Sequence, residues 1–68
     1  MHERVEKMLQ EIKGVYETRF EQFSPNEIIM ILTDKEGEDV FHSEHVDSKE
    51  KAIRQTYAWF QKNSPAKT

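Results

Sequence analysis

The sequence predicts a small α+β domain with an antiparallel β-hairpin packed against two helices, in the order α-β-β-α. Three observations lead to this prediction. Apolar residues recur at helical spacing over residues 2–23, an acidic turn with a glycine joins two strand-like stretches within 27–46, and a helix-start signal precedes an amphipathic stretch at 48–62. Sixty-eight residues make a single domain, 1–68.

The first helix is expected over residues 2–23, because apolar side chains follow one another at steps of three and four. This spacing places on one side of a helix Val5, Met8, Leu9, Ile12, Val15, Tyr16, Phe20 and Phe23. Pro25 then ends the helix, since proline disfavours helical geometry in the residue before it.

The hairpin is expected over 27–46, with Gly37 taking the positive-φ position of its turn. The loop length leaves two registers open. A three-residue loop pairs Leu32 with Val40, whereas a loop of two or four residues pairs Leu32 with Phe41. We favour the second register, because it gathers the apolar side chains of both strands on one face.

The second helix is expected over 48–62, with Asp47 as its N-cap and Glu50 three residues later, followed by a tail at 63–68. The expected core draws on every element and comprises Val5, Leu9, Ile12, Tyr16, Phe20, Phe23, Ile28, Met30, Leu32, Phe41, Ile53 and Phe60.

A two-stranded hairpin has two faces, and two helices side by side cover only one of them. Ile29, Ile31 and Val40 are therefore expected on the second, uncovered face, where they would bind another protein or a second copy of the chain. Homodimerisation could use the strand edge, the strand face or the overhanging end of the first helix, and the sequence leaves these alternatives open.

Two further surfaces are candidates for protein binding. One is the acidic turn with Glu36, Glu38 and Asp39, and the other is the side of the second helix with Tyr57 and Trp59, because aromatic residues often anchor interfaces. We interpret the chain as a non-catalytic interaction module that acts as a regulator, adaptor or inhibitor of another protein. Its length is typical of many phage and mobile-element gene products.

Neither catalysis nor a cofactor is predicted. The chain has no cysteine, its only glycines are Gly14 and Gly37, and no phosphate-binding loop is present. No metal site is predicted either, because strand alternation would separate His42 from His45. We expect no membrane span and a cytoplasmic location, which suits a chain without disulfides.

The alternative function is nucleic-acid binding by the second helix. Its stretch SKEKAIRQTYAWFQK combines aromatic residues with four cations, Lys49, Lys51, Arg54 and Lys62. This stretch resembles the basic final helix of double-stranded RNA-binding domains, which also run from a helix through strands to a helix. The expected chain departs from that family in lacking a third strand, and its net charge is −3.

Overall fold

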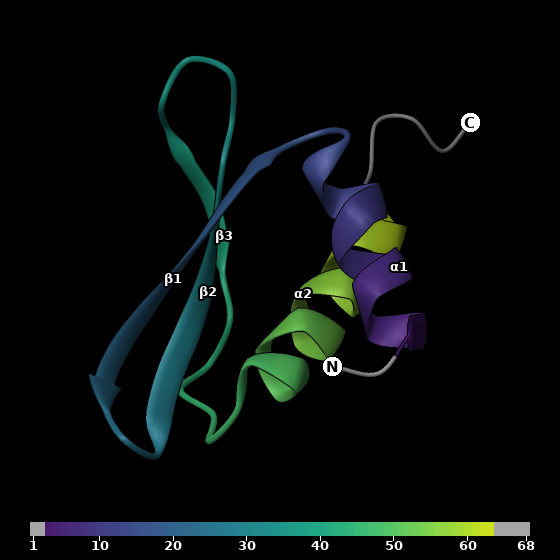
Figure 1. The fold of residues 1–68 in the computed structure, drawn as a ribbon. Helices are drawn as coiled ribbons and strands as arrows, with labels where there is room; N and C mark the ends of the chain where they lie inside the picture. Colours follow the sequence, from purple (N-terminus) through teal and green to yellow (C-terminus); the bar gives the residue numbers. More distant parts are fainter. Residues whose placement is uncertain (1–2, 64–68) are drawn as a thin grey trace.

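The computed structural model describes residues 3–63, which form a three-stranded antiparallel sheet with two helices on one of its faces (Figure 1). The elements run in the order α1 (Glu3–Lys13), β1 (Glu17–Ser24), β2 (Glu27–Thr33), β3 (Asp39–His42) and α2 (Lys49–Asn63). The strands are arranged β1-β2-β3, so β2 is central. The predicted α+β class is confirmed. The part of the predicted tail that follows Asn63 lies outside the described residues.

The predicted first helix over 2–23 is wrong in its second half. The helix ends at Lys13, the Gly14 N–H donates to the carbonyls of Gln10 and Glu11, and the chain turns into β1. Tyr16, Phe20 and their neighbours mislead because a step of four residues satisfies both the helical period and the strand period of two. Pairing along the whole of β2 decides in favour of the strand.

The hairpin register is the one that the sequence favours. Leu32 of β2 pairs with Phe41 of β3, and Gly37 in the intervening turn has a φ of 87°. The turn is fixed by Asp34, whose Oδ1 accepts hydrogen bonds from the backbone N–H groups of Glu36 and Glu38, both at 2.9 Å. This carboxylate therefore organises the turn from within.

The main core lies between β2 and the helices. Met30 and Leu32 are fully buried there, together with Val5, Ile12, Ala52 and Ile53. Phe23 was expected in this core, but it is 55% exposed, because strand alternation turns it away from the face that Phe20 shares with Met30. Its ring instead stacks on His45, with centroids 5.0 Å apart.

Ile29 and Ile31 were expected to face water, which is wrong, because they are only 8% and 6% exposed. The third strand explains the difference: β1 places Glu21 opposite Ile29 and Arg19 opposite Ile31, and β3 places His42 opposite Ile31. Long polar side chains on both flanking strands thus surround the two isoleucines on the face without helices. Val40 is 37% exposed, as expected.

Ser43 determines how the chain leaves the sheet. Its buried hydroxyl accepts a hydrogen bond from the Met30 N–H at 2.9 Å and donates one to the Glu44 carbonyl at 3.0 Å. The hydroxyl therefore replaces a backbone acceptor in the ladder beside β2. The chain then loops outward and rejoins β2 at Val46, which exchanges two backbone hydrogen bonds with Ile28.

We expect Ser43→Ala to lower the free energy of unfolding by about 1–3 kcal/mol, because the Met30 N–H would lose its buried partner. Urea unfolding measures the change. Ser24→Ala is the control, since the exposed Ser24 hydroxyl accepts a single 3.4 Å bond from the Asn26 N–H and its loss should cost under about 0.5 kcal/mol. Equal losses in the two variants would contradict the buried role of Ser43.

We expect Ile31→Ala to lower the free energy of unfolding by about 2 kcal/mol, because the side chain is buried within one chain. Val40→Ala removes a smaller, partly exposed side chain and should cost under about 1 kcal/mol. Chemical unfolding at several protein concentrations measures both. A loss for Ile31→Ala that vanishes on dilution would mean that a second copy, and not the chain itself, covers this residue.

Candidate functional site

The candidate site is a groove of about 600 Å³ between the outer strand β3 and the helix α2. Its lining includes the stacked pair of Phe41 and Trp59, whose ring centroids lie 4.8 Å apart at an interplanar angle of 19°. His42 and Glu44 line it on the strand side, and Ala58 is among the residues that line it on the helix side. We call these surroundings the β3–α2 groove.

Contacts on either side hold Trp59 in place. Its indole ring lies 6.0 Å from the ring of Tyr16, which in turn meets Phe60 edge-on. Gln55, one turn before Trp59, accepts a 2.8 Å hydrogen bond from the Glu44 N–H and so ties the exit of β3 to α2. Trp59 remains half-buried, with part of its aromatic surface open to a partner.

Tyr57 lies apart from the groove, although the sequence grouped it with Trp59. Its hydroxyl donates a 3.1 Å hydrogen bond to Glu11 of α1, and its ring stacks near Phe60. Burial raises the pKa of Tyr57, and the Glu11 carboxylate raises it further by favouring the protonated hydroxyl. Tyr57 thus serves the contact between the helices.

The carboxylates of the acidic turn differ in whether they have a partner within the chain. Asp39 faces the Arg19 guanidinium at 3.5 Å and accepts a 3.4 Å hydrogen bond from the Thr33 hydroxyl. Glu36 and Glu38 are exposed, and neither forms an ion pair within residues 3–63. Of the three turn acids named from the sequence, two are therefore free to meet a partner.

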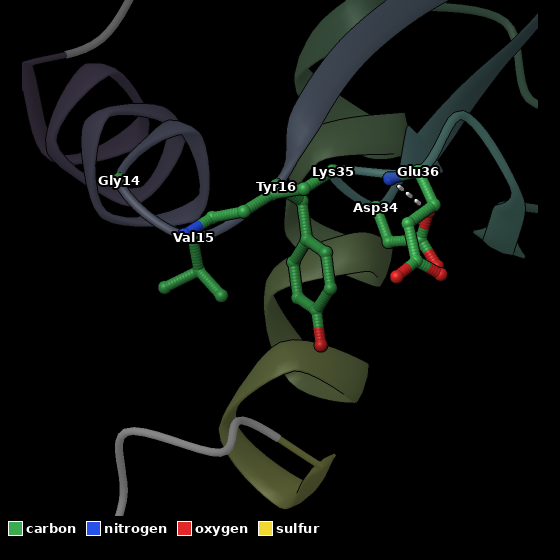
Figure 2. A pocket seen from close by; sticks show the side chains of 6 residues that line it. All are labelled: Gly14, Val15, Tyr16, Asp34, Lys35 and Glu36. Carbon is green, nitrogen blue, oxygen red and sulfur yellow. Dashed lines mark hydrogen bonds between the residues drawn. The ribbon is translucent and has the colours of Figure 1, made fainter.

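A second hollow, of about 430 Å³, lies where the turn after α1 approaches the acidic turn (Figure 2). It is lined by Gly14, Val15, Tyr16, Asp34, Lys35 and Glu36. Figure 2 shows the Tyr16 ring pointing along α2 and the Asp34 carboxylate turned toward its own turn. Tyr16 and Asp34 are thus engaged elsewhere, and the side chains at this hollow do not converge on a ligand.

The four cations proposed for nucleic-acid binding do not form one field. The Lys49 ammonium lies 5.2 Å from the centre of the Phe20 ring, and Lys62 lines the β3–α2 groove. The other two are paired with nearby acids: Lys51 pairs with Asp47, just before α2, at 2.9 Å, and Arg54 pairs with Glu50 of α2 at 3.3 Å.

The start of α2 differs from the prediction. The N-cap is Ser48, whose hydroxyl accepts a 3.2 Å hydrogen bond from the Lys51 N–H, whereas Asp47 was expected in this role. Asp47 instead uses its carboxylate for the ammonium of Lys51. The hydrogen bond from the Lys51 ammonium to the Asp47 carboxylate, together with the positive charge of Lys51, holds the pKa of Asp47 below its ordinary value.

The histidines serve local contacts. His45 bonds through Nδ1 to the Glu27 carboxylate at 2.5 Å, and His42 Nδ1 lies 3.1 Å from the Ser43 carbonyl. Within residues 3–63 no three side chains of histidine, aspartate or glutamate gather in a way that could hold a metal ion. In that same range neither helix has the length and apolar character needed to cross a membrane.

No protein-family model, curated protein sequence or solved structure matches this chain.

The sequence pointed to Trp59 but missed the groove. Phe41 was placed in the core, and Gln55 and Ala58 were not considered as site residues. The signal lay in the preferred register, which puts Phe41 on the helix-facing side of its strand. Its stacking on Trp59 depends in addition on where α2 crosses the sheet, which no local pattern encodes.

The low pKa of Asp47 predicts a pH dependence. Its ion pair with Lys51 should stabilise the fold above the unfolded pKa, near the ordinary value of 3.8, and this contribution should disappear as the pH falls through the lower folded pKa. Asp47→Asn should therefore lower the melting temperature at neutral pH but hardly at acidic pH, and high salt should also shrink the difference. A difference that is independent of pH would contradict the ion pair.

Proposed function

We propose that this chain is a non-catalytic protein-interaction module that acts as a regulator, adaptor or inhibitor of another protein through the β3–α2 groove. One observation carries the proposal: a partly exposed tryptophan, Trp59, stacks on Phe41 in a groove beside an outer strand. Partly exposed aromatic residues in concave surroundings are frequent anchors of protein interfaces, because a partner removes much apolar area from water there.

The proposal includes self-association, for which the outer edge of β1 is the better place. Ile29 and Ile31 are nearly covered within one chain, so the face that carries them offers little apolar area. β1 has eight residues and, at its end, the exposed Phe23. Size-exclusion chromatography with light scattering tests this part, and a monomeric mass at high concentration would reject it.

Nucleic-acid binding is retained as the alternative because of the third strand. The order α-β-β-β-α, with both helices on one face, removes the difference in strand number from double-stranded RNA-binding domains. The ion pairs of Lys51 and Arg54 weigh against this alternative, because they neutralise two of the four cations on α2.

If the alternative were correct, wild-type protein would bind a labelled RNA duplex with a steep salt dependence, and Lys51→Glu combined with Arg54→Glu would abolish binding. We expect no such binding by wild-type protein in fluorescence polarisation. Salt-dependent binding lost in the double variant would favour the alternative over the interaction module.

For the interaction module we expect Ala58→Arg to prevent partner capture. Ala58 is exposed on α2 and lines the groove, so the larger side chain should fill the groove without disturbing the core. Gln10→Arg adds the same charge to an exposed position of α1 and is the matched control. Affinity purification with quantitative mass spectrometry should find a protein that both wild type and Gln10→Arg retain and that Ala58→Arg loses by at least about tenfold.

Circular dichroism should show that both arginine variants keep the wild-type fold. A partner retained equally by all three proteins would move the interaction away from the groove and reject the proposed site.

A further inference from the structure

β3 is the outer strand of the sheet beside the groove. Because the sheet order is β1-β2-β3, one edge of β3 pairs with β2, and within residues 3–63 no strand pairs with its other edge. Such an edge presents a row of unpaired N–H and C=O groups that can accept a further strand. The β3–α2 groove runs along this edge, with His42 and Glu44 among the residues that line it.

The register identifies which backbone groups point outward. The Ser43 N–H donates to the Met30 carbonyl at 2.9 Å, and backbone groups alternate in direction along a strand. His42 therefore directs its N–H and C=O away from β2. Val40 has no counterpart on β2, because the register shifts between Leu32 and Thr33. The free edge is thus centred on residues 40–42.

The negative charge around the free edge of β3 indicates what kind of partner it would bind. Residues 34–44 hold five acids against one lysine, a net charge of −4. Asp39 pairs with Arg19, whereas Glu36, Glu38 and Glu44 form no ion pair with a described residue. Lys62 is the one lysine or arginine in the groove lining. The field at the edge therefore favours a basic segment.

The same charge disfavours a second copy at this edge. Antiparallel pairing of β3 with β3 of another chain would bring two segments of net charge −4 together, with like charges across the new ladder. A basic peptide meets no such repulsion, and it brings the cations that the free carboxylates lack.

Resting on the function proposed above, we propose that the β3–α2 groove binds an extended, basic segment of another protein, which adds to β3 as a fourth strand. Main-chain hydrogen bonds join the segment to Val40 and His42. Alternate side chains of an added strand point to opposite faces, so every second residue enters the groove. These are apolar and contact Phe41, Ala58 and Trp59, and the basic residues between them meet the carboxylates of the turn.

The test uses the full chain and a capped synthetic peptide of about six residues that alternates lysine with valine, to match an added strand. Trp59 is the only tryptophan of the chain and lines the groove, so its fluorescence reports occupancy directly. We expect a saturable fluorescence change, together with NMR shifts of the Val40 and His42 amides.

Three control peptides separate strand addition from simple attraction. N-methylation of alternate backbone amides removes outward N–H groups and should weaken binding by at least about tenfold. Replacement of lysine by glutamate should abolish binding, and replacement of valine by serine should weaken it, because the groove would lose its apolar contacts. Ala58→Arg protein should also bind at least about tenfold more weakly than Gln10→Arg protein.

Several results would overturn the inference. Equal binding of the N-methylated peptide would mean attraction by charge without a ladder, and absence of any saturable change would reject basic strand addition. A concentration-dependent dimer mass that is lost in Ala58→Arg would assign the edge to a second copy. If Ala58→Arg still loses a captured partner while the peptide does not bind, the interaction module stands and only the strand addition fails.

Discussion

The structure depends on one constraint, which is that β2 is apolar on both faces. All six residues from Ile28 to Thr33 are buried, so both edges and both faces of the strand must be covered by the rest of a small chain. β1 and β3 cover the edges, and the two helices cover one face. The second face has no layer of its own, and side chains from the flanking strands cover it instead, among them Arg19 and His42.

This arrangement explains where the molecule has surface left for binding. The helices are committed to one face of β2, and the polar side chains of β1 and β3 are committed to the other. What remains is the perimeter, where β3 lies beside α2. There Phe41 cannot be enclosed by β2 alone, and Trp59 completes its burial only in part, so the groove follows from the scarcity of covering elements.

Much of the fold is readable from the sequence, because local rules decide it. The α+β class, the Leu32–Phe41 register and the positive φ of Gly37 all follow from periodicity and turn chemistry. The strand at residues 17–24 cannot be predicted in this way, since Tyr16 and Phe20 fit both the helical and the strand period. Only pairing with β2 decides between helix and strand. The groove is harder to predict than this strand, because Phe41 and Trp59 are distant in sequence and the path of the intervening chain decides that they meet.

The shortness of β3 has a consequence for how long any partner stays. Its four residues end just before Ser43, whose hydroxyl takes the place of a backbone acceptor beside β2. An added strand can therefore form hydrogen bonds with only a few backbone groups of β3. A handful of main-chain hydrogen bonds, each contributing about 1 kcal/mol, favours rapid dissociation. Tight association would then require a second point of attachment on the same partner. The same brevity protects the edge from open-ended stacking of strands into fibrils.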